Sequence, residues 1–442
     1  MTRPAPTAAP SLPDRILGVF TRVEPGESGT ALLLMLNLFL VLTSYYILKT
    51  VREPLILMGG GAEVKSYAAA GQAVLLLGVI PLYSALVDRM DRVTLINRVT
   101  LFFMANLGLF YVLARLGTPY LGVAFFLWVG IFSLMIIAQV WSFANDLYTE
   151  GQGKRLFPVV AFGSSLGAVA GSLVAGRLYA LGLGSFEMML AAAALLGACL
   201  GLTNAVRRRE AASLARREAA PARSDDAEAS TGANGFRLVL SDPYLRGIAA
   251  LYLLLNLVNS TGEYILSRTV TEAAAAAPPA AREAVVGGFY AGFFTWVNAL
   301  GAVLQLFAVS RILRVAGVAR ALLVLPLIAL GGYAVIAAGA ALGVIRGAKI
   351  LENATDYSLH NTTRQALFLP TSREAKYKAK QTIDTFFYRA GDVSAAGVVW
   401  LGATLGFGTR QFALVNLGAV AVWLAVSVAV GRGFRSRTEE AA

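Results

Sequence analysis

Long runs of apolar residues recur along this chain, and short polar segments separate them. A helix needs about 20 mostly apolar residues to cross a membrane. Twelve such runs are present, and we predict a spanning helix for each. The predicted spans are approximately residues 31–51, 68–86, 93–113, 120–147, 157–180, 186–206, 244–266, 286–309, 319–338, 342–366, 383–405 and 412–430. The tenth is so polar that it is either a helix buried in the bundle or a cytoplasmic loop.

The composition agrees with a membrane protein. Hydrophobic residues make up 57% of the chain and charged residues 14%, against about 45–50% and about 25% in soluble domains. The single cysteine, Cys199, and the single histidine, His360, exclude an intrachain disulfide and a Cys/His zinc site. No pairing of a nucleophile with a base stands out, so we expect no enzyme, no metal and no cofactor.

The distribution of Lys and Arg predicts the orientation. The two tails and the alternate loops between them contain 26 of the 38 basic residues, and the opposite side contains 10. Basic residues concentrate on the cytoplasmic side of membrane proteins, so both termini are predicted to be cytoplasmic. That requires an even number of spans and favours a true tenth span. The net charge of +12 then reflects topology, and we expect no nucleic-acid partner.

The first 28 residues are polar and Pro-rich, unlike a signal peptide. We expect a monomer in the lipid of a bacterial inner membrane.

A polar, charged stretch at residues 207–243 divides the chain. We predict a cytoplasmic tail at 1–28, an N-terminal bundle at 29–206, this cytoplasmic linker, a C-terminal bundle at 244–430 and a tail at 431–442. The order aromatic-Ser-apolar-x-Asn occurs at both 141–145 and 357–361. Two pseudo-symmetric six-helix halves are the plan of the major-facilitator fold, which is all-α and binds its substrate near the midplane.

The predicted loop between spans two and three contains Asp88, Arg89 and Arg92. It resembles the facilitator loop motif Gly-x-x-x-Asp-Arg-x-Gly-Arg, with Ser84 and Asp91 in place of the glycines. These residues are candidates for gating through a charge lock on the cytoplasmic side. The alternative is an ordinary basic cytoplasmic loop.

Ionisable residues inside spans are costly and are functional candidates by default. Two cations at the end of span one could bind phosphate, or they could extend to the membrane interface. Polar side chains in span seven either contact a ligand or form an interhelical hydrogen-bonded seam. Spans ten and eleven have the densest polar cluster, and we expect Arg52 and Lys380 to face one central cavity. The candidate substrate-binding residues are Lys49, Arg52, Glu53, Asn145, Asn259, Glu263, Tyr357, Asn361, Arg364, Lys380, Asp384, Arg389 and Asp392.

Small residues recur at every fourth position of span five, at Gly163, Gly167, Gly171 and Ala175. That spacing lets two helices approach closely, so it predicts packing.

Several short stretches together resemble the plastid- and bacterial-type ATP/ADP translocases. Their first-span motif Leu-Arg-x-x-Lys-Asp-x-Leu is similar to residues 48–55. Their Trp-x-Phe-Ala-Asn and Lys-Arg-Phe-Tyr-Pro motifs resemble residues 141–145 and 154–158, and their Asn-Leu-Val resembles 256–258. Similar motifs of spans ten and eleven match residues 356–358, 364–370 and 378–384.

The resemblance implies a nucleotide exchanger that uses charged residues within the membrane. The family's first-span lysine corresponds to Arg52. Its seventh-span acid corresponds to Asn259, with Glu263 one turn further on, and a lysine of span eleven corresponds to Asp392. The family's fourth-span acid has no clear counterpart near Val129.

Three functions follow as hypotheses. The first is exchange of nucleotides of the ATP/ADP type by alternating access. The second is proton-coupled transport of another anionic small molecule, with Glu263, Asp384 or Asp392 as the proton carrier. The third is a scaffold without transport, whose linker at 207–228 recruits a partner.

The topology gives a first testable prediction. A Ser224→Cys thiol in the linker should react with a membrane-impermeant maleimide only in inside-out vesicles, because the linker is predicted to be cytoplasmic. Reaction from the outside alone would contradict the predicted orientation.

Overall fold

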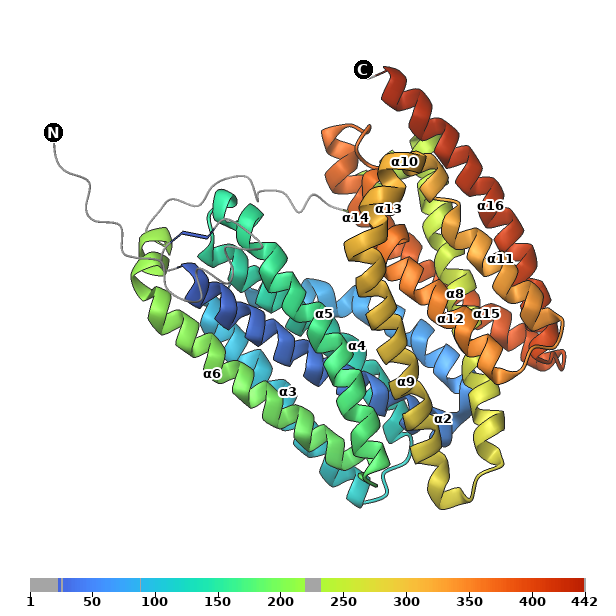
Figure 1. Cartoon of the computed structure of the whole chain (residues 1–442), viewed down its shortest axis with the longest axis horizontal. Coiled ribbons are helices and arrows are strands. Elements are labelled where there is room, and N and C mark those ends of the chain that lie inside the picture. The colour runs from blue at the N-terminus through green and yellow to red at the C-terminus, as the bar shows by residue number, and fades with distance from the viewer. Residues whose placement is uncertain (1–22, 25–26, 88, 219–231, 441–442) are drawn as a thin grey trace. The chain divides into compact units, whose positions relative to one another are not determined.

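The computed structural model describes residues 23–24, 27–87, 89–218 and 232–440. Within these ranges the regular elements are all helices, as Figure 1 shows. The all-α class predicted from the apolar runs is confirmed.

The first two predicted spans form one long helical element, α2 (Glu27–Val87), broken at Gly61. The backbone of Gly61 has φ 76° and ψ −176°, a conformation that side chains with a Cβ rarely adopt. The break therefore divides α2 into two helical arms. Each arm contains one of the predicted spans.

Predicted spans three to six each form one helix. They are α3 (Arg92–Arg115), α4 (Leu121–Leu147), α5 (Glu150–Ala180) and α6 (Ser185–Glu218). Helix α6 continues beyond the predicted end of span six, into the first part of the linker. Residues 219–231 of that linker lie outside the described residues. The linker ends in α7 (Gly232–Ser241), which meets the following helix at a bend of 107°.

The second half of the chain contains α-helices, one short 3₁₀ helix and several widened π-helical turns. It begins with α8 (Pro243–Ala275), the short η2 (Pro279–Ala281), α9 (Arg282–Val303), the π turn η3 (Leu304–Ala308), α10 (Val309–Ala321) and α11 (Val324–Ala337). It continues with α12 (Leu342–Thr355), the π turn η4 (Asp356–His360) and α13 (Asn361–Ala366). The last elements are η5 (Ala375–Ala379), α14 (Lys380–Thr382), η6 (Ile383–Phe387), α15 (Tyr388–Thr404) and α16 (Thr409–Glu440).

All twelve predicted spans fall on helical segments. Seven of the described helices are long and apolar enough to cross a membrane, or eight if the bent pair α7–α8 is one span. The polar tenth run is helical and continuous through α12, η4 and α13, and Lys349, Glu352 and Asp356 are buried in it. Of the two alternatives for this run, the buried helix is therefore the one found.

The chain divides into two compact units. The N-unit comprises Met1–Val51, Ile80–Pro119 and Trp128–Arg223, and the C-unit comprises Arg52–Val79, Tyr120–Leu127 and Ser224–Ala442. The C-unit thus includes two segments of the predicted N-terminal bundle. The division into the two predicted bundles stays a prediction.

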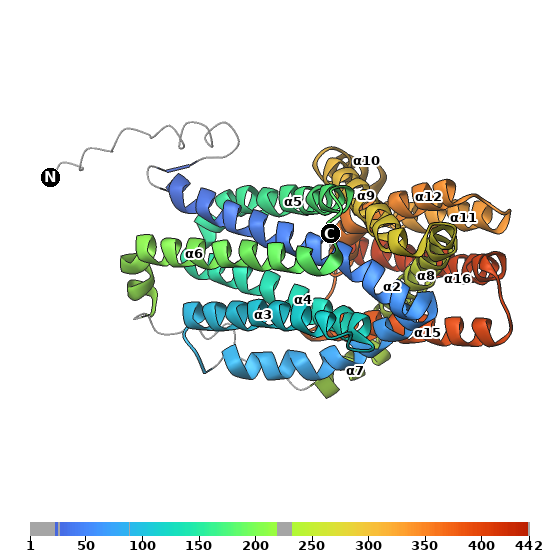
Figure 2. The same cartoon turned by 90° about the horizontal axis from the view of Figure 1, so that it is seen from below.

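In the N-unit, α5 lies close to the first arm of α2, and α3 packs against α6; Figure 2 shows these helices alongside one another. A Cβ at Gly163, Gly167 or Gly171 would collide with the α2 backbone, at Gly167 with the carbonyl of Phe39. The packing role predicted for these glycines is confirmed. Between α3 and α4, the buried rings of Phe103, Trp128 and Phe132 pack with their centroids 5.2–5.4 Å apart.

In the C-unit, α8 packs against both α15 and α16, and α12 packs against α9 (Figure 1). The side chain of Asp242 caps the first turn of α8, where Pro243 occupies a position that needs no N–H donor. Asp242 also accepts a bond of 2.8 Å from Arg437 of α16. The cap and the ion pair together hold the start of α8 against the end of the chain.

The glycine contacts predict a stability difference. Gly167→Ala should lower the thermal unfolding midpoint of the detergent-purified protein, because the added methyl group overpacks the α2–α5 contact at a cost of about 1–3 kcal/mol. Gly201→Ala is the matched control: Gly201 is also helical, but a Cβ there meets nothing within 4 Å. Equal midpoints for the two variants would contradict the packing role.

Candidate substrate-binding site

A polar pocket of about 250 Å³ lies within the C-unit. Helix α8 contributes one aromatic side chain, and the remaining lining comes from α13, η6 and α15. The lining residues are Tyr252, Asn361, Arg364, Gln365, Asp384, Tyr388 and Arg389. Four of the predicted site residues therefore share this pocket: Asn361, Arg364, Asp384 and Arg389.

Two π-helical turns position these side chains. Turn η4 directly precedes Asn361 and Arg364, and turn η6 contains Asp384 and directly precedes Tyr388. A π turn adds a residue to one turn and changes the direction of the side chains that follow. Asp384 and Tyr388, four residues apart across the end of η6, nevertheless line the same pocket.

Arg364 is the central cation of the pocket. Its guanidinium lies over the ring of Tyr252, with the centroid at 4.9 Å, and near the ring of Tyr388 at 5.9 Å. Its Nη2 is 3.5 Å from Asp356 Oδ1, a long contact. Within the described residues its buried Nε has no hydrogen-bond partner. Arg364 can therefore donate to a ligand in the pocket.

The second cation, Arg389, is close to a carboxylate of its own helix. Its Nη1 is 3.6 Å from Asp392 Oδ2, and Asp392 accepts a bond of 2.7 Å from Ser260 of α8. Asp392 is thus held against α8 and is not among the pocket-lining residues. Lys380 is also outside the lining, with its ammonium 5.9 Å from the ring of Phe368.

A second charged cluster lies further along α8 and α12. Lys349 is 1% exposed, and its Nζ is 2.8 Å from Glu352 Oε1 and 3.1 Å from Asn259 Oδ1. Glu263 accepts a bond of 3.0 Å from Asn353. The predicted ligands Asn259 and Glu263 therefore contact α12 in this structure.

The charged residues at the end of span one have different neighbours. Lys49 lies over the ring of Tyr46 at 5.2 Å. Arg52 forms a salt bridge of 2.6 Å with Glu53 and lies over the ring of Phe126 at 4.4 Å. Since neither Arg52 nor Lys380 lines the pocket, their sharing of a central cavity stays a prediction.

The other predicted residues lie elsewhere. Asn145 is exposed on α4, and Tyr357 is 48% exposed on η4. Of the gating candidates, Asp88 is outside the described residues, and Arg92 forms a salt bridge of 2.8 Å with Asp146 of α4. Arg89 is exposed. Their gating role stays a prediction.

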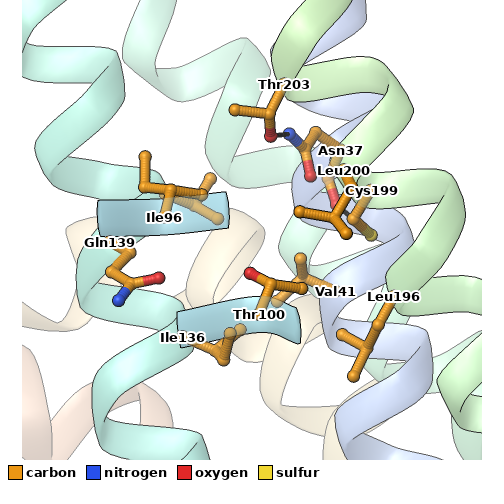
Figure 3. A pocket seen from close by; sticks show the side chains of 11 residues that line it. Asn37, Val41, Ile96, Thr100, Ile136, Gln139, Leu196, Cys199, Leu200 and Thr203 are labelled. Carbon is orange, nitrogen blue, oxygen red and sulfur yellow. Dashed lines mark hydrogen bonds between the residues drawn. The ribbon is translucent and has the colours of Figure 1, made fainter. Parts of the chain in front are cut away.

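A much smaller cavity lies in the N-unit, and Figure 3 shows the side chains around it. Asn37 donates a bond of 2.8 Å to Thr203 there, while Gln139 is 1% exposed and lies near the hydroxyl of Tyr83. Its volume of about 10 Å³ has room for one water molecule at most. It is too small for an organic substrate.

Three pocket residues are absent from the sequence-based set: Tyr252, Gln365 and Tyr388. Tyr388 lies in the stripe of polar residues at every fourth position of span eleven, between Asp384 and Asp392, whereas nothing in the local sequence marks Tyr252 or Gln365. Lys349 stands out in the sequence only as a polar interruption, although a lysine in an apolar run already indicates a buried partner.

Comparison with known families supports the resemblance found in the sequence. The family model described as "TLC ATP/ADP transporter" matches residues 320–434. The resemblance to ATP/ADP translocases is thus confirmed in the C-terminal part of the chain. A comparison with curated proteins finds no match.

Solved structures of transporters share the fold. A mutant form of the nucleoside transporter NupG aligns with a TM-score of 0.64 and 13% identity, over 92% of this chain and 99% of its own. A bacterial homologue of the iron transporter ferroportin, in an inward-facing state, aligns with a TM-score of 0.65 and 15% identity, over 91% of this chain and 98% of its own. The peptide transporter POT in complex with sulfate aligns with a TM-score of 0.62 and 13% identity, over 96% of this chain and 99% of its own.

The fold is of the major-facilitator type. At these low identities the structural likeness establishes the fold alone. Together with the apolar helices and the family match, it identifies an integral, multi-pass membrane protein and supports transport of a small molecule. The specific membrane, the orientation and the monomeric state stay predictions.

The buried pair in the second cluster predicts a measurable effect. Lys349→Met should lower the thermal unfolding midpoint strongly, because an unpaired Glu352 in the interior costs about 3–5 kcal/mol. The double variant Lys349→Met/Glu352→Gln should regain most of the loss, since it removes the unpaired charge of Glu352, while Glu263, 3.9 Å from Lys349, keeps its hydrogen bond from Asn353. A single variant as stable as the double would contradict this pairing.

Proposed function

We propose that this protein is a membrane transporter that exchanges nucleotides by alternating access. The pocket around Arg364 binds an anionic part of the substrate. The family match and the transporter fold point to a carrier rather than an enzyme.

The unpartnered Nε of Arg364 is the observation on which this proposal rests. A buried N–H without an acceptor is unfavourable, and a guanidinium binds phosphate oxygens with several donors at once. A phosphate in the pocket would offer acceptors to this guanidinium, which lines the pocket. The rings of Tyr252 and Tyr388 offer faces against which a base or ribose can pack.

The size of the pocket fits part of a nucleotide. Its volume of about 250 Å³ is below the about 300–1,000 Å³ of common ligand pockets. Phosphate is the part of a nucleotide whose charge and acceptors match Arg364 and Arg389. Six of the seven lining residues also fall within residues 320–434, where the ATP/ADP transporter model matches.

Substitution of Arg364 tests the proposal. In proteoliposomes, radiolabelled ADP should enter against preloaded ATP, and Arg364→Gln should raise the apparent KM about tenfold or more, because a hydrogen bond to a charged group contributes about 1.5–3 kcal/mol. Arg364→Lys should keep part of the affinity through its charge.

Arg410→Gln serves as the control, because Arg410 is exposed at the start of α16 and also lies within the matched region. Kinetics of Arg364→Gln equal to those of Arg410→Gln would overturn the assignment of the pocket. The absence of any nucleotide counterflow in the unmodified protein would overturn nucleotide exchange itself.

One observation favours the alternative of proton-coupled transport of another anion. Asp384 lines the pocket, and both arginines there have an acidic neighbour, Asp356 or Asp392. The internal carboxylates offset much of the positive charge that a polyphosphate requires. Uptake of an anion that depends on a pH gradient, without counter-substrate, would support this function instead.

A further inference from the structure

A buried ion pair joins the two arms of α2 across the break at Gly61. Lys65 Nζ lies 2.6 Å from Glu53 Oε2. Glu53 is 1% exposed and Lys65 is 8% exposed. A buried pair of opposite charges holds its geometry, because separating it leaves two charges without hydration or partner. This pair therefore fixes the second arm against the first.

The same lysine connects α2 to two helices of the predicted C-terminal bundle. Lys65 Nζ donates to Ser267 Oγ of α8 at 2.8 Å, and its ammonium lies 5.0 Å from the ring centroid of Tyr290 of α9. Ser267 and the Tyr290 hydroxyl are 2.9 Å apart. One ammonium group thus contacts α2, α8 and α9.

A second contact lies one helical turn away on α8. The Tyr264 hydroxyl donates to Glu63 Oε1 at 2.8 Å. Arg268, next to Ser267, donates to the carbonyl of Phe407, between α15 and α16, at 2.7 Å. The segment around Gly61 is therefore attached to α8 at two adjacent positions.

All of these contacts lie at the helix ends that are predicted to face away from the cytoplasm. The break at Gly61 follows span one, α8 reaches Ser267 at the end of span seven, and Phe407 lies between spans eleven and twelve. Residues 52–79 and 120–127 of the predicted N-terminal bundle accordingly belong to the C-unit. Gly122 packs against the backbone carbonyl of Leu55 and completes this region.

We infer that Glu53, Lys65 and Ser267, together with Glu63 and Tyr264, form an outer latch that has to open once in each transport cycle. Alternating access moves one bundle against the other, and the latch joins outer helix ends of both predicted bundles. The inference rests on the proposed transport function. It gives Glu53, an expected substrate ligand, the role of a gating residue.

Crosslinking tests whether the latch has to open. In a Cys199→Ala background, Lys65→Cys/Ser267→Cys should be bridged by a short bis-methanethiosulfonate reagent. ATP/ADP counterflow should then stop, and a reductant should restore it. The control pair is Asn97→Cys/Asn204→Cys, since these asparagines are hydrogen-bonded at 3.2 Å between α3 and α6, within one predicted bundle. Bridging this pair should leave counterflow unchanged.

Full counterflow through protein bridged at residues 65 and 267 would overturn the latch.

A second readout, the labelling rate of a buried thiol, does not depend on the substrate. Ser267 is buried, so a Ser267→Cys thiol should react slowly with an impermeant maleimide added outside the cell. Adding Glu53→Gln/Lys65→Met should raise that rate at least severalfold, whereas Asn97→Leu/Asn204→Leu should not.

An unchanged labelling rate would overturn the latch even if the protein transports nucleotides. Accelerated labelling without any nucleotide counterflow would support the latch and reject nucleotides as the substrate. The failure of the latch and the failure of the proposed function are thus distinguishable.

Discussion

Charged side chains in the interior of an apolar helix bundle lose their hydration, so each needs an opposite charge or a strong hydrogen bond nearby. This constraint organises the C-unit. Lys65 contacts Glu53, Lys349 contacts Glu352, and Arg389 is close to Asp392. Helix α8 provides a hydrogen-bond partner for each pair: Ser267 for Lys65, Asn259 for Lys349 and Ser260 for Asp392. The polar stripe along α8 is therefore the surface on which α2, α12 and α15 assemble.

Arg364 differs from the other buried cations of the described C-unit. Its contact with Asp356 is long, its Nε lacks a partner, and it lies beside a cavity. A cation whose hydrogen bonds are complete stabilises the fold and has little to offer a substrate. Incomplete pairing beside an open space is what a binding residue requires, because the ligand then supplies the missing acceptors.

The pocket and the ion pair of Glu53 and Lys65 lie toward opposite ends of the helices. The pocket is lined by residues near the start of α8 and α15, at helix ends predicted to be cytoplasmic, and the contacts of Glu53 and Lys65 lie toward the opposite ends. A transporter has to bind its substrate on one side while the other side is closed. In the C-unit, the pocket and the contacts of Glu53 and Lys65 therefore lie at different positions along α8, the helix that contributes to both.

The sequence by itself determined the helical class, the membrane location and the close packing of one face of α5, although not that its partner is α2. Runs of about 20 apolar residues have no other stable place, and a glycine at every fourth position marks one helix face. It also predicted Asn361, Arg364, Asp384 and Arg389, because ionisable and amide groups in a span stand out against apolar neighbours. These features depend on local composition and spacing.

Only the tertiary structure decided which polar residues share the pocket. Tyr252 of α8, distant in the sequence, lines the cavity together with Tyr388 of α15, whereas Tyr357 of η4 is exposed. Likewise, Glu53 contacts a lysine twelve positions away only because Gly61 folds α2 back on itself. The pairing of charges depends on distances between helices, and a periodic pattern along one helix does not contain those distances.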